Sequence, residues 1–217
     1  MAAPVTSWDP RRFAHVRFDR VRDLIERFSG EPDWPTVSML DHCLELAGMH
    51  LVEAPKTRAA LGADGAIDPA SLYEIRIVER GEIPTRPRNL HDLLNALVWA
   101  AFPHTKLALT RRLATIQRAR AAGRATLPST RTREHDRLAM FDEGALLRVS
   151  GTTWIFGHAI YEHTYAGELA VRGAAVDLDV PGLDGLGIVE ARAAIDHILA
   201  GLDLATSLRE GSGVVVD

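Results

Sequence analysis

Apolar side chains recur every three or four positions through much of the chain, which is the spacing of amphipathic helices. In residues 13–28 the apolar positions are Phe13, Val16, Val21, Leu24, Ile25 and Phe28, and Gly30 follows them. A second segment starts near Thr36 and places Val37, Leu40, Leu44 and Ala47 on one side. These patterns predict two helices, separated by the proline-containing breaker at residues 31–35.

Residues 72–78 alternate instead between apolar and polar side chains, which is the period of a half-exposed strand. Tyr73, Ile75 and Ile77 would share one face of this strand, and Glu74 and Arg76 the other. The alternation therefore predicts a strand, which Gly81 and Pro84 would end.

The most regular helical pattern follows Asn89, a residue type favoured at helix N-caps. Asp92 would occupy the third helical position, as in a capping box. The apolar stripe behind them consists of Leu90, Leu93, Leu94, Leu97, Val98 and Ala101. Pro103 breaks this helix and suits the first turn of another, which is predicted to reach about residue 122.

The remaining sequence mixes short helical and strand patterns. Helices are predicted over residues 133–140, 157–165 and 188–204, and strands over 145–149, 152–156 and 174–180, the first two joined by the Ser150-Gly151 turn. Residues 205–217 have the character of a loose tail. The whole pattern predicts a single α+β domain over residues 1–217, predominantly helical, with a small, mainly antiparallel sheet.

Composition limits the location and the partners of this domain. With 217 residues, 47% hydrophobic and 25% charged, the chain can bury a sizeable core. A net charge of -4 argues against nucleic acid as a partner. The lone Cys43 excludes an intramolecular disulfide. No apolar run approaches the ~20 residues of a membrane span, and no signal peptide is recognisable, so we expect a cytoplasmic protein without a membrane partner.

Several longer motifs carry a family resemblance. They are Tyr73-Glu-Ile-Arg-Ile, Gly81-Glu-Ile-Pro-Thr-Arg86, Asn89-Leu-His-Asp-Leu-Leu-Asn-Ala-Leu-Val-Trp99, Phe102-Pro-His-Thr-Lys106, Phe141-Asp-Glu-Gly144 and Phe156-Gly-His-Ala-Ile-Tyr-Glu162. Together with Trp8-Asp-Pro and Trp34-Pro, they resemble the bacterial DUF3025 family over about residues 8–165. Leu90 and Thr110 depart from the family pattern, and neither is a candidate site residue. The name denotes a domain of unknown function, so the resemblance implies a grouping and no mechanism.

The helix after Asn89 carries the candidate catalytic residues. Its apolar stripe leaves His91, Asp92, Asn95 and Trp99 on the remaining surface. Imidazole titrates close to neutral pH, so a His with a carboxylate and an amide nearby could perform general acid/base catalysis. His91 and Asp92 are therefore the predicted catalytic pair. The alternative is that Asp92 helps to cap the helix and His91 is an ordinary exposed residue.

Cationic side chains at the same helix start predict an anion site. Arg86 and Arg88 precede backbone N–H groups that the helix dipole makes attractive to negative charge. Lys106 lies similarly in the first turn of the next helix. The predicted ligand-binding set for a small phosphate or carboxylate is Glu74, Arg76, Arg86, Arg88, Asn95 and Lys106, with Glu74 orienting Arg76. Alternatively, Arg86 and Arg88 pair with acids such as Glu79 or Glu82, an arrangement that contributes little energy.

A divalent metal is the cofactor hypothesis. His158 and Glu162 are four residues apart on a predicted helix and would project from one face. His91, Asp142 and Glu143 could complete a nitrogen and oxygen ligand set. The spacing differs from that of the zinc-protease motifs, and the sequence has no glycine-rich phosphate loop, nucleophile elbow or dinucleotide fingerprint.

These candidates leave three functional hypotheses. The leading one is a small hydrolase-like enzyme that acts on an anionic ligand held at a helix N-terminus. The first alternative is a non-catalytic protein that binds a ligand or a partner, and the second is a metal-dependent hydrolase using His158 and Glu162. Geometry separates the first two, because an enzyme needs His91, Asp92 and the arginines to converge on one concave pocket.

Overall fold

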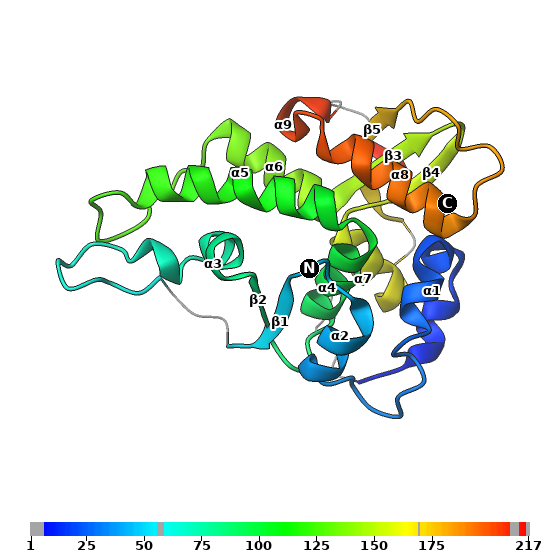
Figure 1. The fold of residues 1–217 in the computed structure, drawn as a ribbon, viewed down its shortest axis with the longest axis horizontal. Helices are drawn as coiled ribbons and strands as arrows, with labels where there is room; N and C mark the ends of the chain where they lie inside the picture. The colour runs from blue at the N-terminus through cyan, green and yellow to red at the C-terminus, as the bar shows by residue number, and fades with distance from the viewer. Residues whose placement is uncertain (1–6, 56–58, 169, 209–212, 216–217) are drawn as a thin grey trace.

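A computed structural model describes residues 7–55, 59–168, 170–208 and 213–215. In chain order its elements, with η for a 3-10 helix, are η1 (Pro10–Ala14), η2 (Val16–Val21), α1 (Arg22–Ile25), α2 (Val37–Leu44), β1 (His50–Glu53), η3 (Pro69–Ser71), α3 (Tyr73–Arg80), β2 (Glu82–Thr85), α4 (Leu90–Ala101), α5 (Pro103–Ala121), α6 (Arg133–Gly144), β3 (Ala145–Val149), β4 (Thr152–Ile155), α7 (His158–Ala166), β5 (Arg172–Leu178), α8 (Ile188–Ala200), α9 (Leu204–Ser207) and β6 (Gly213–Val215). Helices predominate over two small sheets (Figure 1), so the predicted α+β class is confirmed.

The long helix α5 runs through the middle of the molecule (Figure 1). Near its start it packs against α8, where the buried carboxylate of Asp196 accepts hydrogen bonds from the backbone N–H groups of His104 and Thr105. Toward its other end it packs against α3, where Arg118 pairs with Glu79. The helix therefore links the half of the molecule that contains α3 to the half that contains α8.

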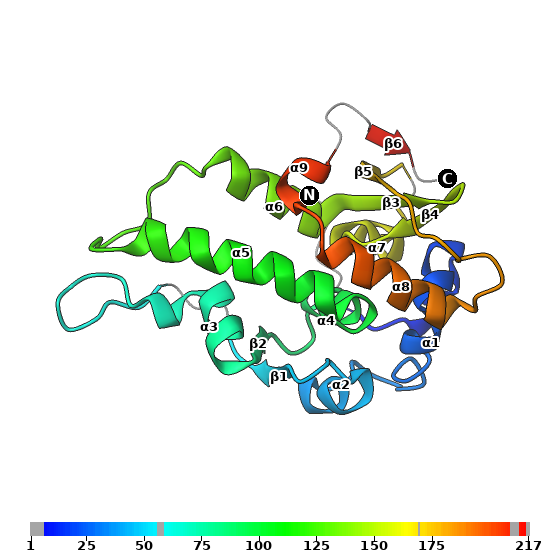
Figure 2. The same ribbon diagram turned by 45° about the horizontal axis from the view of Figure 1, so that its top comes forward.

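The larger sheet has the strand order β4-β3-β5-β6. Strands β3 and β4 form the predicted antiparallel hairpin, and Ser150 and Gly151 both adopt positive φ angles in its turn. Strand β5 lies parallel to β3, and β6 lies antiparallel to β5 at the edge of the sheet (Figure 2). A separate parallel pair, β1 and β2, was not anticipated from the sequence.

The segment predicted as a strand is the helix α3, so that prediction is wrong. Ile75 and Ile77 are both fully buried, but residues two apart lie about 200° apart around a helix and face different neighbours. Ile75 packs with Leu72 and Ala114 in a small cluster, whereas Ile77 belongs to the main core. A helix buried on two sides thus produces the same alternation as a half-exposed strand.

The first predicted helix is divided into η1, η2 and α1. His15 is extended between the first two pieces, with ψ 140°. Phe13 and Val21 are buried as expected, but Val16 is 63% exposed, contrary to the prediction. A 3-10 helix has about three residues per turn, so α-helical spacing does not carry Val16 to the core.

Helix α2 begins as predicted and ends earlier. The Thr36 side chain caps it by accepting a hydrogen bond from the Met39 N–H. It ends at Leu44 because Glu45 takes the left-handed conformation, with φ 51°. Ala47 therefore lies beyond the helix and is exposed, which corrects its predicted place on the buried side.

The C-terminal segment is more ordered than a loose tail. Ala205 and Leu208 are buried, and Arg137 of α6 donates hydrogen bonds to both of their carbonyl oxygens. Strand β6 pairs with β5. The tail prediction is therefore wrong for these parts, while residues 209–212 and 216–217 lie outside the described residues.

Helix α4 follows its prediction except at Trp99, which was expected on the polar surface but is buried in the main core. It runs from Leu90 to Ala101, and the Asn89 side chain caps it by accepting a hydrogen bond from the Asp92 N–H. The predicted apolar stripe is buried against the main core. This burial fixes the rotation of α4 and turns its polar side outward. No helix in the described part of the chain is long and apolar enough to cross a membrane.

Candidate functional site

A concave cavity of about 400 Å³ lies beside the polar side of α4. Its walls come from the loop after β1, from α3, from the start of α4, and from the ends of α6 and α7 that face each other. Its polar lining consists of Ser71, Tyr73, Glu74, Arg76, Arg86, His91, Asp92, Asn95, Asp142, Glu143 and His158. Glu74, Arg76, Arg86, His91, Asp92, Asn95 and His158, all chosen from the sequence, are thus brought together in one cavity.

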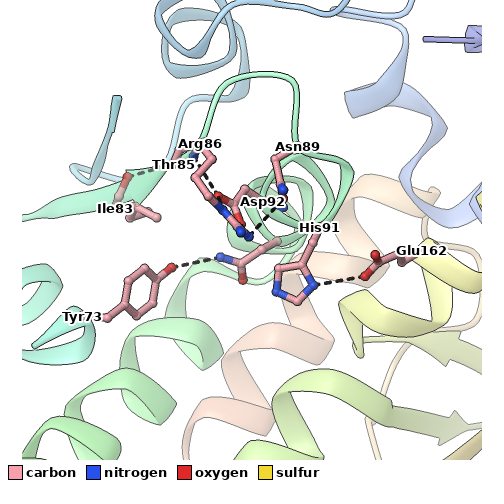
Figure 3. A network of polar contacts seen from close by, with 9 residues as sticks. Tyr73, Ile83, Thr85, Arg86, Asn89, His91, Asp92 and Glu162 are labelled. Atoms are coloured by element: carbon pink, nitrogen blue, oxygen red, sulfur yellow. Dashed lines mark hydrogen bonds and ion pairs between the residues drawn. The ribbon is translucent and has the colours of Figure 1, made fainter. Parts of the chain in front are cut away.

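Arg86 is held against the first turn of α4 (Figure 3). Its Nε and Nη2 groups donate to the two carboxylate oxygens of Asp92 at 2.8 and 2.7 Å, and its backbone N–H also donates to Asp92. Nη2 makes a further hydrogen bond of 3.1 Å to Asn89 Oδ1. Asp92 therefore fixes Arg86, and the catalytic partnership predicted between Asp92 and His91 is not the contact observed.

His91 pairs instead with Glu162 of α7 (Figure 3). Its Nδ1 lies 3.1 Å from Glu162 Oε2, and both side chains are about half-buried. The hydrogen bond to Glu162, followed by the carboxylate charge, raises the pKa of His91 against the opposing effect of burial. The same bond lowers the pKa of Glu162. Nδ1 thus carries the shared proton, and Nε2 is the nitrogen left for a ligand in the cavity.

His158 is the buried neighbour of His91. Their rings meet edge to face, with centroids 4.6 Å apart. His158 Nδ1 lies 2.9 Å from the Asp142 carbonyl oxygen, which can only accept, so Nδ1 carries the proton. Burial lowers the pKa of His158 to about 4, which keeps the ring neutral near pH 7. Its buried Nε2 therefore carries a lone pair that can accept a hydrogen bond, and it has no hydrogen-bond partner among the described residues.

Arg76 and Glu74 line the cavity from α3. Arg76 donates from Nε and Nη2 to Glu82 at 2.9 and 2.7 Å, so Glu82 orients it and not Glu74. Burial raises the pKa of Glu74 above its usual range. As the pH falls, the protonated fraction of Glu74 grows. The protonated carboxyl group can donate a hydrogen bond in the cavity.

Lys106 lies beneath the cavity and does not line it. The side chain is 3% exposed, and its Nζ donates to Asn95 Oδ1 at 2.8 Å and to the Asp142 carboxylate. Nζ also lies 5.5 Å from the centre of the Trp99 ring. Burial alone would raise the pKa of Asp142, but Lys106 and then His158 lower it below the ordinary value. Lys106 is therefore a support for the cavity wall, and no longer a candidate for direct contact with a ligand.

Arg88 lies apart from this cavity. It is exposed, it has a positive φ of 55°, and it pairs with Asp33 at 2.6 Å. The predicted anion site at the start of α5 is also occupied, because the Asp196 carboxylate accepts from the first-turn N–H groups there. The anion set expected from the sequence is thus reduced to the residues around Arg76 and Arg86.

The metal hypothesis finds part of its residue set. His158 and Glu162 lie on α7 as expected, and His91 is near both. Within residues 7–55, 59–168, 170–208 and 213–215, no three or more His, Cys, Asp and Glu side chains form a group that could hold a metal ion.

Tyr73 is a lining residue that was not identified from the sequence. Asn95 Nδ2 donates to its hydroxyl oxygen at 3.1 Å. The incorrect strand prediction placed Tyr73 on an apolar face with Ile75 and Ile77, which concealed its polar role. On a helix, Tyr73 begins the first turn and reaches across to α4 (Figure 3).

These features define a helical α+β protein with a polar cavity lined by His91, which pairs with Glu162. Residues 63–153 match the family model described as "Protein of unknown function (DUF3025)". This match confirms the resemblance to DUF3025 over residues 63–153. No curated protein matches the chain.

A solved structure shows a distant similarity. It is the apo structure of the cold active phenylalanine hydroxylase from Colwellia psychrerythraea 34H, with a TM-score of 0.45 and 13% sequence identity. The similar region covers 73% of this chain, and the chain spans 60% of the length of that protein.

Proposed function

We propose that the cavity is the active site of a small hydrolase whose substrate carries an anionic group. The observation that carries the proposal is the convergence of His91, Arg76 and Arg86 on one concave site, with His91 bonded to Glu162. An imidazole with a shifted pKa in a cleft is a common feature of active sites. The same residues spread over a flat surface would have favoured simple recognition.

In this proposal His91 transfers the proton. Glu162 holds the Nδ1–H group, so Nε2 of neutral His91 removes a proton from a water molecule while the water oxygen attacks the substrate carbon or phosphorus. The protonated His91, stabilised by Glu162, then returns that proton to the leaving group. The role of Glu162 is to orient the imidazole and to stabilise its positive charge.

Arg76 and Arg86 would hold the anionic group. Each is fixed through Nε and Nη2 by a carboxylate, Glu82 or Asp92, which leaves Nη1 without a hydrogen bond to the described residues. Fixed guanidinium groups lose little side-chain entropy on binding. Because their charges are already paired, we expect modest affinity for simple anions and recognition that depends on hydrogen-bond geometry.

A substrate screen with paired variants tests the proposal. Carboxylate-bearing esters, amides and phosphate esters would be offered to the wild-type protein, to His91→Gln and to His163→Gln. His163 is a matched control because this histidine of α7 also pairs with a glutamate, Glu168 just beyond the helix end, but does not line the cavity. We expect turnover by the wild type and the control, and a loss of about 10²-fold or more in His91→Gln.

Two outcomes would contradict it. Equal turnover by His91→Gln and the wild type would remove His91 from the mechanism. Ligand binding in the cavity without turnover of any substrate class would favour the non-catalytic alternative.

A further inference from the structure

The hydroxyl of Tyr73 has a direction that follows from its neighbours. Lys106 Nζ lies 2.8 Å from one end of the Asn95 amide, and the Tyr73 hydroxyl lies 3.1 Å from the other. An ammonium group donates and never accepts, so the end that meets Lys106 must be the amide oxygen. The amide nitrogen then faces Tyr73 and donates to it.

The proton of the Tyr73 hydroxyl is consequently not used in the hydrogen bond with Asn95. Its oxygen accepts from Asn95, and the O–H group has no acceptor among the residues that the structure describes. Tyr73 lines the cavity, with 40% of the residue exposed. The O–H group is thus available to an acceptor inside the cavity.

Two further features keep this arrangement fixed. Lys106 is held by Asn95, by the Asp142 carboxylate and by the face of Trp99, so it does not release the Asn95 oxygen readily. Although 40% of the residue is exposed, desolvation of its hydroxyl, followed by the charge of Asp142, raises the pKa of Tyr73 above its ordinary value. Tyr73 therefore keeps its proton at all physiological pH values.

We infer that Tyr73 donates its O–H hydrogen bond to an oxygen of the substrate, and that Asn95 and Lys106 position it for this purpose. The inference rests on the proposed active site and adds a donor to it. The oxygen it would contact is a carbonyl, carboxylate or phosphoryl oxygen, the kind that gains negative charge when water attacks. Tyr73 would then stabilise that charge while His91 moves the proton.

Neutron diffraction on deuterated crystals tests the direction of the hydroxyl. We expect the deuterium on Tyr73 to point into the cavity and two deuterium atoms on the Asn95 nitrogen that faces it. In the shape-conserving variant Asn95→Asp, the new carboxylate can only accept, so the deuterium should turn toward it. A wild-type deuterium that points at residue 95 would overturn the inference.

Binding of inorganic phosphate tests the use of this donor. Calorimetric titration should give an affinity about tenfold or more lower in Tyr73→Phe, since a hydrogen bond to a charged oxygen is lost. Tyr165→Phe is the control, because its hydroxyl accepts from the Asp9 N–H away from the cavity. Equal affinity in Tyr73→Phe and the wild type, or an equal loss in both variants, would overturn the inference.

The two tests also separate this inference from the proposed function. If phosphate does not bind the wild-type protein, the anion site proposed around Arg76 and Arg86 is contradicted. In that case, the inference that the Tyr73 O–H group is a donor toward the cavity is supported if its deuterium points into the cavity, and contradicted if it does not.

Discussion

His91 and His158 are in ring contact, yet their surroundings shift their pKa values in opposite directions. Glu162 raises the pKa of His91, while burial lowers that of His158 to about 4. Near neutral pH one imidazole can gain or lose a proton, and the other remains neutral. Groups of one type tuned apart by their environments are typical of sites that divide acid and base roles.

The low pKa of His158 predicts an acid-sensitive fold. Its folded-state pKa of about 4 lies below the ordinary 6.5, so the unfolded chain binds the proton more tightly. The stability contributed by neutral His158 is complete above pH 6.5 and is lost as the pH falls toward 4, by about 3 kcal/mol in total. Denaturant titrations at pH 7 and pH 4.5 should show a smaller pH dependence in His158→Gln.

The exposed His163 provides the comparison for that measurement. It bonds to Glu168 at the surface, so His163→Gln should keep the pH dependence of the wild type. If the His158→Gln and wild-type curves were parallel, His158 would not be the group responsible.

At the residue scale, the sequence identified several of the site residues but did not predict which residues they contact. His91 stood out because the apolar stripe of its helix excluded it, and Glu162 because of its spacing from His158. Their contact spans 71 residues of chain and depends on how α4 packs against α7, which no local pattern encodes. Asp92 was predicted to act with its sequence neighbour His91, whereas its carboxylate forms an ion pair with Arg86.

Among the elements, the start of α7 is constrained by a close approach of two backbones. A Cβ atom at Gly157 would lie 2.4 Å from the Glu143 carbonyl oxygen and 2.5 Å from the Gly144 Cα. Both of these are backbone atoms and cannot rotate away. The close approach brings His158 next to the end of α6, where its Nδ1 reaches the Asp142 carbonyl.

This close approach predicts a strong effect of Gly157→Ala. We expect a loss of about 3 kcal/mol or more in the free energy of unfolding, since the backbones must separate. Gly30→Ala is the matched control, because its added Cβ meets nothing within 4 Å and should change stability by less than about 1 kcal/mol. Similar values for both variants in chemical denaturation would contradict the close approach.

The elements also show where periodicity is decisive and where it fails. Helix α4 has a continuous stripe and a cap, so local rules located it from Asn89 onward. Helix α3 is buried on two sides, with Ile75 in the cluster that contains Ala114 of α5 and Ile77 in the main core. A pattern shaped by remote packing cannot be distinguished locally from a strand, and Tyr73 was misplaced as a result.

For the molecule as a whole, α9 closes one end of the core. Leu204 is 5% exposed there, whereas Leu202, two residues earlier, is 40% exposed. We expect Leu204→Ala to cost about 2–5 kcal/mol of unfolding free energy and Leu202→Ala about 1 kcal/mol or less. Equal and small losses in denaturant titrations would contradict the packing of Leu204 in the core.

The composition and the pattern of the whole chain were sufficient to predict a mainly helical α+β fold. The cavity was not predictable in the same way, because its walls come from residues 54–55, 59–95 and 142–158, which only the complete fold brings together. His91, which lines the cavity, and its partner Glu162 can both be tested by substitution.

The pH dependence of kcat/KM in the wild type and in Glu162→Gln tests that pair most directly. A general base must be neutral, so kcat/KM should rise with pH through the pKa of His91, which Glu162 holds above 6.5. Removing the carboxylate should move this rise to lower pH, while Glu168→Gln, which alters only the surface pair with His163, should leave it in place. A rise at the same pH in Glu162→Gln and the wild type would contradict the account.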